Sequence, residues 1–142
     1  KQVSLAAMLQ RDKLVLNNVT VNVECDETSL LIGAKHGFAN ILMILFDNSI
    51  YQFETLKTEG AKIDIRVTKT DKYVEIKFKD NAGGISIEPI EKVFEMQFTT
   101  KGREGCGLGL PLAKKLTKNA LFGDINVENK NDGAEFTIMV KI

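Results

Sequence analysis

The sequence has little of what marks several classes of protein. Its 19 basic and 19 acidic side chains cancel, so no net field draws it to nucleic acid or to an anionic membrane. Its two cysteines, Cys25 and Cys106, form no C-x-x-C pair, which argues against a zinc site and fits a reduced compartment. The longest apolar run, 41–46, is far shorter than the roughly 20 residues that span a bilayer. We therefore expect no contact of this chain with nucleic acid or membrane.

The length of 142 residues fits a single domain, 1–142, which can bury roughly two thirds of its unfolded surface without disulfides or metal. The first residues show no apolar stretch behind a basic start, so we do not expect them to be a secretory signal. Because the sequence begins with Lys1 rather than methionine, we expect a segment of a longer protein. The segment should be cytoplasmic, whereas the longer protein could be anchored in the inner membrane.

Short alternating segments predict a β-sheet. Five strands are expected, over 19–25, 63–67, 74–78, 125–127 and 136–142. The turns at 68–72 and 131–133 favour two hairpins. Alternation of apolar and polar residues along the strands predicts one apolar and one solvent-facing surface.

Three helices are expected, over 35–58, 88–94 and 108–121, from apolar residues at three- and four-residue spacing. The first helix carries a stripe of Phe38, Ile41, Leu42, Leu45, Ser49, Phe53 and Leu56, and the last one of Leu112, Ala113, Leu116 and Ala120. Together with the strands, they predict an α+β fold. It would be a two-layer sandwich whose mixed, mostly antiparallel five-stranded sheet has one face covered by helices.

Two glycine-bearing segments flank a stretch without periodicity. The first, Asp80–Ile85, follows a predicted strand, and the second, Gly105–Leu110, precedes a predicted helix. Neither has the spacing of a Rossmann fingerprint or a P-loop. The alternate glycines of the second segment let backbone N–H groups approach an anion at the positive end of a helix, although a flexible turn that caps a helix fits them equally. The arrangement favours a nucleotide site with a movable cover, a lid at about 95–107.

Four motifs in order resemble the ATP-binding domain of sensor histidine kinases, within the wider gyrase, Hsp90, histidine kinase and MutL ATPase group. Ile44–Ser49 resembles the helical N box, Asp80–Ile85 the first glycine box, Phe94–Phe98 the F box and Gly105–Leu110 the second glycine box. The resemblance extends from about Phe38 to Ile142, and it implies the Bergerat ATP-binding fold. Thr99-Thr100-Lys101 and the doubled Gly-Leu pair are more typical of histidine kinases than of the other branches.

The resemblance implies ATP and Mg²⁺ as ligands and assigns a role to several residues. Asp80 matches the aspartate that accepts a hydrogen bond from the adenine amino group, and Gly84 lets the base lie close to the backbone. Asn48 matches the asparagine that holds Mg²⁺ against the phosphates. The nucleotide-binding residues expected on this basis are Asn48, Tyr51, Gln52, Asp80, Ala82, Gly84, Ile85, Phe98, Thr99, Thr100, Lys101, Gly105, Gly107, Leu108, Gly109 and Leu110.

Four positions depart from the family's pattern. Ile44 stands where a second asparagine is frequent, and Tyr51 where a phosphate-contacting lysine or arginine is common. Ala82 replaces the first glycine of the first glycine box, a mild change because one methyl group can be accommodated. Ala134 takes a place where Ser or Thr often supports the adenine-binding aspartate. The changes at 44 and 51 remove polar contacts near Mg²⁺ and the phosphates. They therefore predict either weaker ATP binding or a larger role for Lys101 in neutralising the phosphate charge.

The only histidine, His36, precedes Gly37 and Phe38, whereas the family's phosphoacceptor histidine is followed by an acidic residue on a helical hairpin. The resemblance therefore implies no catalytic residue within this chain. A separate phosphoacceptor and dimerisation domain would supply the histidine, and a response regulator would act downstream. The segment alone should be monomeric, within a dimeric whole protein. Two alternatives stay open, a stand-alone serine kinase of the anti-sigma type and a non-catalytic nucleotide-sensing module.

Overall fold

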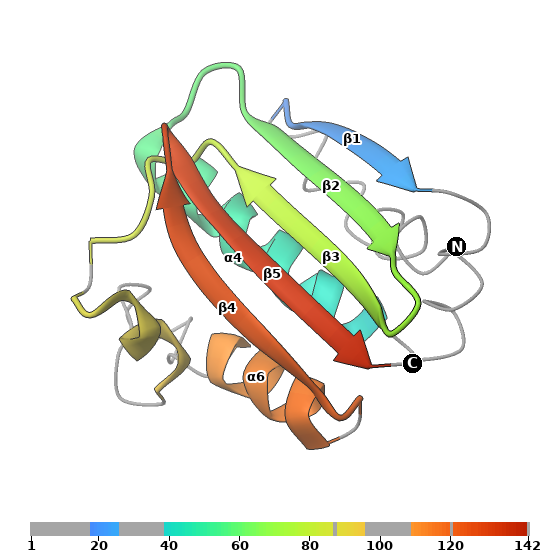
Figure 1. Ribbon diagram of the computed structural model, residues 1–142. Coiled ribbons are helices and arrows are strands. Elements are labelled where there is room, and N and C mark those ends of the chain that lie inside the picture. Colours follow the sequence, from blue (N-terminus) through green and yellow to red (C-terminus); the bar gives the residue numbers. More distant parts are fainter. Residues whose placement is uncertain (1–17, 26–38, 87, 96–108, 120, 142) are drawn as a thin grey trace.

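The computed structural model describes residues 18–25, 39–86, 88–95, 109–119 and 121–141 (Figure 1). In chain order the elements are β1 (Thr20–Cys25), α4 (Ala39–Leu56), β2 (Lys62–Lys69), β3 (Tyr73–Asp80), the 3-10 helix η1 (Ile90–Phe94), α6 (Gly109–Asn119), β4 (Gly123–Lys130) and β5 (Gly133–Lys141). Within these ranges no helix is long and apolar enough to cross a membrane.

The strands form one five-stranded sheet in the order β1-β2-β3-β5-β4. β1 and β2, which flank α4 in the sequence, pair in parallel, with Thr20 opposite Lys62. The other neighbours are antiparallel. Both predicted hairpins, β2–β3 and β4–β5, are confirmed, as is the mixed and mostly antiparallel sheet. β5 lies between β3 and β4, so the two hairpins meet at the centre of the sheet.

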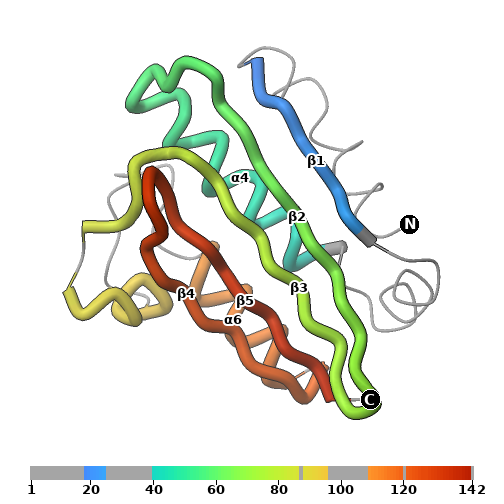
Figure 2. Tube along the Cα trace, turned by 45° about the horizontal axis from the view of Figure 1, so that its top comes forward, coloured from blue at the N-terminus to red at the C-terminus, as the bar shows by residue number. Residues whose placement is uncertain are grey.

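Both long helices cover the same face of the sheet (Figures 1 and 2). Alternate residues of β2 and β3 are buried on this face, as the period of two predicts. Phe46 of α4 contacts Phe78 of β3 edge to face, with ring centroids 5.2 Å apart. Phe94 of η1 contacts Phe136 of β5 in the same way, at 6.2 Å. The expected two-layer α+β sandwich is confirmed.

The opposite face of the sheet is polar and carries ion pairs between neighbouring strands. Arg66 Nε of β2 lies 3.0 Å from Glu24 Oε2 of β1, and Lys130 Nζ of β4 lies 3.2 Å from Glu135 Oε1 of β5. Such pairs contribute little to stability where solvent screens them. This polar face leaves the helical layer as the place where a buried site can form.

The helix bounds differ from expectation at points where the structure gives a reason. α4 ends at Leu56 rather than 58, because Lys57 has a φ of 51° and the Thr58 N–H bonds to the Phe53 carbonyl, a Schellman-type end. The segment expected as a short helix over 88–94 is a 3-10 helix that begins at Ile90. The predicted start of the first helix at 35–38 and all residues before 18 lie outside the described residues.

Two leucines assigned to buried stripes are exposed. Leu112 in the first turn of α6 is 48% exposed, whereas Ala113 and Thr117 are buried. Successive helix residues are about 100° apart, so a helix that packs through Ala113 turns Leu112 away from the sheet. Leu56, the last residue of α4, is 55% exposed and lies beside the glycine loop, where a Cβ added to Gly83 would be 3.2 Å from its Cδ1.

Candidate functional site

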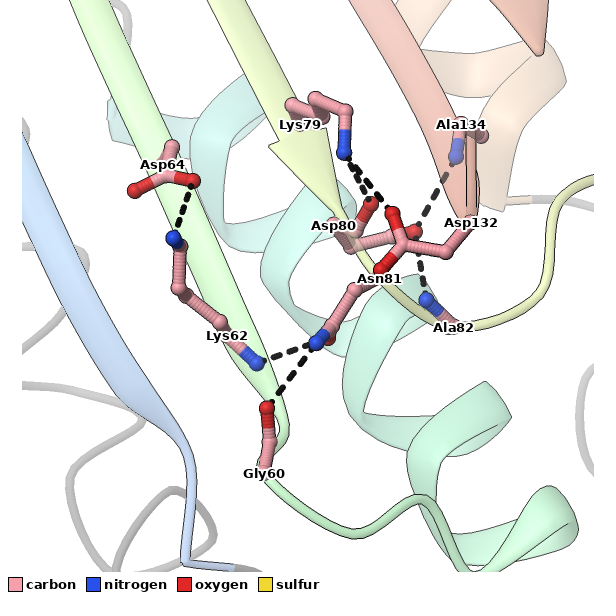
Figure 3. Close-up of polar contacts among 9 residues, drawn as sticks. All are labelled: Gly60, Lys62, Asp64, Lys79, Asp80, Asn81, Ala82, Asp132 and Ala134. Carbon is pink, nitrogen blue, oxygen red and sulfur yellow. Dashed lines mark hydrogen bonds and ion pairs between the residues drawn. The ribbon is translucent and has the colours of Figure 1, made fainter. Parts of the chain in front are cut away.

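The Asp80 carboxylate lies at the end of β3 and is 3% exposed. The described residues donate three hydrogen bonds to it: Oδ1 accepts from the backbone N–H of Ala82 at 3.1 Å and of Ala134 at 3.3 Å, and Oδ2 accepts from Ser49 Oγ at 2.6 Å. Figure 3 shows the two backbone bonds. A carboxylate offers about four acceptor positions, so Oδ2 keeps capacity for one further donor.

The Ala134 position shows how this sequence departs from the family's pattern without losing support for Asp80. The Ala134 side chain cannot donate, but its backbone N–H does. The hydroxyl group comes instead from Ser49 of α4, which is 0% exposed. Ser49 was predicted on the buried stripe of that helix and at the end of the N box, but without a role of its own, and its contact with Asp80 is long-range in sequence.

The loop after Asp80 turns sharply at two glycines. Gly83 and Gly84 have φ values of 88° and 81°, a region that side chains other than glycine rarely adopt. Ala82 lies outside this region and is 2% exposed, so its methyl group is accommodated, as expected. The Gly83 N–H donates to the Asp132 carbonyl at 2.8 Å, which ties the loop to the β4–β5 turn.

Two asparagine side chains hold the loop at its ends. Asn81 accepts from the Lys62 N–H at 2.8 Å and donates to the Gly60 carbonyl at 2.9 Å (Figure 3). Asn129 of β4 accepts from the Ile85 N–H at 2.7 Å and donates to the Ile85 carbonyl at 2.8 Å. Each amide uses one acceptor and one donor, so the loop is fixed to β2 on one side and β4 on the other.

Gly133, the first residue of β5, permits a close approach of two backbones. A Cβ at this position would overlap the Asp80 carbonyl group. Only glycine therefore allows the start of β5 to pack against the end of β3 here, which brings the Ala134 N–H to the Asp80 carboxylate. Neither Gly133 nor Asn129 was predicted as part of the site, because Gly133 contacts Asp80 and Asn129 contacts Ile85, partners that lie far from them in the sequence.

α4 connects the Asp80 region with the first turn of α6. Asn48 is buried, at 8% exposure, next to Ser49. Ile44, one helical turn earlier, lies against Gly109, where an added Cβ would be 3.5 Å from Ile44 Cγ2. Ile44 thus provides an apolar packing contact at the position where the family frequently has a polar asparagine side chain. Tyr51 and Gln52, one turn after Asn48, are half-buried.

Lys79 places a positive charge beside the loop. Its Nζ lies 3.3 Å from Asp132 Oδ1 and 3.4 Å from the Asp80 carbonyl oxygen (Figure 3). The hydrogen bond from Lys79 lowers the pKa of the Asp132 carboxyl group below its ordinary value. On the neighbouring strand pair, Glu128 and Glu135 raise the pKa of Lys130.

The described residues include part of the predicted nucleotide-binding set. Asp80 and Ala82 are joined by a hydrogen bond at the end of β3, and Gly84 and Ile85 follow in the same loop. Asn48 is buried on α4 next to Ser49, which bonds to Asp80. α6 begins with the half-buried pair Gly109 and Leu110. The other predicted residues lie outside the described part of the chain: Phe98, Thr99, Thr100, Lys101, Gly105, Gly107 and Leu108. Among the residues that are described, no group of three or more His, Cys, Asp or Glu side chains forms a candidate metal cluster.

Comparison with known proteins agrees with this geometry. Residues 33–142 match the family described as histidine kinase-, DNA gyrase B- and HSP90-like ATPase, and the chain belongs to that family. Its relatives place it with the ATPase domains of two-component sensor histidine kinases. Sensor protein CiaH of Streptococcus pneumoniae is 34% identical over 108 residues, which cover 72% of this chain and 23% of CiaH. A probable C4-dicarboxylate sensor kinase of Bacillus subtilis is 30% identical over 106 residues, 74% of this chain and 20% of that protein.

The chain thus spans less than a quarter of the length of these relatives. Among solved structures, the catalytic domain of histidine kinase ThkA superposes with a TM-score of 0.77 at 24% identity, covering 99% of this chain and 91% of that one. Histidine kinase AdeS of Acinetobacter baumannii has a TM-score of 0.72 at 21% identity, covering 99% and 62%. The fold of histidine kinase catalytic domains is therefore confirmed for this chain.

Proposed function

We propose that this chain binds Mg·ATP and donates the γ-phosphate to a histidine on a separate dimerisation and phosphoacceptor domain, as part of a two-component sensor histidine kinase. The observation that carries the proposal is the Asp80 carboxylate, buried and bonded by Ser49, Ala82 and Ala134 with acceptor capacity left on Oδ2. It is supported by membership of the ATPase family.

Asp80 would recognise the adenine amino group. An ionised carboxylate accepts hydrogen bonds and donates none, so it selects the amino group of adenine over the carbonyl oxygen that guanine has at the same ring position. The three bonds from the protein orient the carboxylate before ligand arrives. Gly84, four residues further along the same loop, bears no side chain, which suits the close approach of a flat base to the backbone.

Asn48 would hold Mg²⁺ through its side-chain oxygen. Mg²⁺ prefers oxygen ligands and is often held by few protein groups together with substrate phosphates and waters. A single buried amide is consistent with that donor set, and the amide carries no charge that would compete with the phosphates. Tyr51, Gln52, Ile85, Gly109 and Leu110 are proposed to complete the described part of the site.

Residues 1–142 are proposed to be one domain with a lid at about 95–107. Phe98, Thr99, Thr100 and Lys101 would belong to this lid, and Gly105, Gly107 and Leu108 to the phosphate end of the site. Phosphoryl transfer is mostly positioning and charge neutralisation, and bound Mg·ATP would supply the transferred group. The chain's own residues would bind and orient it, without a nucleophile of their own.

The proposed partners are the phosphoacceptor domain of the same protein and a downstream response regulator. Relatives named as sensor kinases support this. ThkA, which has the same fold at 22% identity and a TM-score of 0.71, has been solved in complex with the response regulator protein TrrA. We propose a cytoplasmic, monomeric segment of a protein that is dimeric as a whole.

Calorimetric titration with ATP, with and without Mg²⁺, tests the proposal. The wild-type chain should bind ATP more tightly with Mg²⁺, and Asp80→Asn should abolish measurable binding because an amide N–H₂ would face the adenine amino group. Asp64→Asn, which changes a carboxylate of β2 on the polar face, is the matched control. Phosphorylation of the purified phosphoacceptor domain added in trans, but not of this chain alone, is the second expected result.

Three outcomes would count against the proposal. Unchanged binding by Asp80→Asn would remove the adenine assignment. ATP binding that is independent of Mg²⁺ would favour a nucleotide-sensing module without kinase activity. Efficient labelling of His36 in the isolated chain would place the phosphoacceptor within it.

A further inference from the structure

Asn129 makes an unusual contact for an exposed strand residue. Its side-chain amide bonds to both backbone groups of one residue, with the Ile85 N–H donating to Oδ1 at 2.7 Å and Nδ2 donating to the Ile85 carbonyl at 2.8 Å. The contact joins β4 to the loop that follows β3. β3 and β4 are not neighbours in the sheet, because β5 lies between them. It therefore fixes the position of a loop residue that the sheet itself does not hold.

The same amide also limits what can stand at Gly84. A Cβ at Gly84 would lie 2.9 Å from Asn129 Oδ1, and the φ of 81° at this residue already favours glycine. The position of the Asn129 side chain therefore requires a residue without a Cβ at position 84. The peptide between Gly84 and Ile85 is held in one orientation by the amide, in the segment that leads from the end of β3 to η1.

We infer that Asn129 is a positioning residue for the adenine end of the nucleotide site. The inference rests on the proposed function, since it takes the base to lie between Asp80 and the Gly84–Ile85 backbone. Asp80 is oriented by its own three bonds, but those bonds do not reach Gly84. Asn129 sets the distance between this backbone and the carboxylate, and so controls how well a base that bonds to Asp80 also contacts the loop.

The chemistry of the amide makes the role specific. Ile85 presents one donor and one acceptor, and an asparagine side chain supplies the complementary pair in one plane. Aspartate keeps the acceptor but places its second oxygen against the Ile85 carbonyl oxygen. Alanine loses both bonds. Asn81 holds the start of the loop in a similar way but bonds to Gly60 and Lys62, so it cannot replace Asn129 at Ile85.

The test compares Asn129→Ala and Asn129→Asp with wild type, and uses Asn126→Ala, an exposed asparagine of the same strand, as the control. Dissociation constants for ADP and for inosine diphosphate are measured by competition with a fluorescent ADP analogue, at a temperature where circular dichroism shows all variants folded. Both Asn129 variants should bind ADP about tenfold more weakly, the equivalent of roughly one net hydrogen bond, and Asn126→Ala should match wild type.

Inosine diphosphate separates positioning from a general loss of structure. It has an oxygen in place of the adenine amino group, so the ratio of its dissociation constant to that of ADP reports the contact with Asp80. This ratio should fall in the Asn129 variants if the base is displaced. Unchanged ADP affinity, or a loss shared equally by both nucleotides, would overturn the role of Asn129 and leave the proposed function intact. Failure of the wild-type chain to bind ADP would overturn both.

Discussion

Ser49 Oγ donates a hydrogen bond to Asp80 Oδ2 at 2.6 Å, between two side chains that are 0% and 3% exposed. The bond joins the middle of α4 to the end of β3 across the interface of the helical layer and the sheet. It therefore couples the position of the helix that carries Asn48 to the orientation of the proposed adenine-binding carboxylate.

Ser49→Ala should destabilise the fold and weaken nucleotide binding together. Removing the hydroxyl group leaves Asp80 Oδ2 with one donor fewer in a buried place, which costs about 1–3 kcal/mol of the free energy of unfolding. The carboxylate also loses part of its orientation, so the dissociation constant for ATP should rise. Urea denaturation and calorimetry measure the two effects.

Thr117→Val is the control for Ser49→Ala. Thr117 is buried, and its hydroxyl group bonds at 2.7 Å to the Ala113 carbonyl of its own helix, so within the described part of the chain this bond links no second element. We expect a smaller loss of stability and no change in ATP affinity. Equal effects of the two substitutions on ATP binding would contradict the coupling through Asp80.

Gly133→Ala should be far more damaging than Gly60→Ala. At Gly133 a Cβ would overlap the Asp80 carbonyl group, whereas at Gly60 it would meet no atom of the described residues within 4 Å. The first change must separate β3 from the start of β5, and we expect a loss of more than about 3 kcal/mol. The second costs only the backbone strain of a φ of 63°, about 1–2 kcal/mol. Denaturant midpoints of the two variants give the comparison, and similar midpoints would refute it.

The fold could be predicted from the sequence because its signals are local. Alternation in 63–67 and 74–78 marked the strands, and the turns marked the hairpins. The position of β5 between β3 and β4 was not predictable in this way, since it depends on which strand edges meet. The exposure of Leu112 was missed for a related reason. The spacing of apolar residues in a helix predicts the direction of its buried side only to within about one residue, or roughly 100°. Packing against the sheet then decides whether Leu112 or Ala113 is buried.

Asp80 and Asn48 could be proposed as site residues because they stand in motifs with a recognisable order. Ser49 ends the N box, but the motif assigned it no role, and Asn129 stands in none of the motifs, so neither was proposed. A serine in an apolar helix stripe is equally suited to fill space, and an asparagine on a strand is usually a surface residue. Their partners are 31 and 44 residues away, and only the tertiary arrangement shows that each bonds to the glycine loop or to the carboxylate beside it.

Asp132 should titrate below the ordinary aspartate pKa of 3.8 because of the hydrogen bond from Lys79. A folded-state pKa below the unfolded one means that the ionised form is favoured by folding. The stabilisation is therefore present above the unfolded pKa and is lost as the pH falls through the folded one. NMR titration of the carboxyl carbon should show the pKa of Asp132 rising in Lys79→Met. Lys72→Met, at the β2–β3 turn, should leave it unchanged, and an unaffected pKa in Lys79→Met would contradict the assignment.

Phe122 combines two unfavourable features in the turn between α6 and β4. Its side chain is 83% exposed, and its φ is 54°, a left-handed conformation that costs a non-glycine residue about 1–2 kcal/mol. Phe122→Gly should therefore stabilise the domain by about 1 kcal/mol after the extra chain entropy of glycine is subtracted. For a chain of this size that raises Tm by about 3–4 °C. Phe122→Ala removes the exposed ring but keeps the backbone strain, so its Tm should stay near that of wild type. If alanine stabilised as much as glycine, the cost would lie in the exposed ring rather than in the backbone.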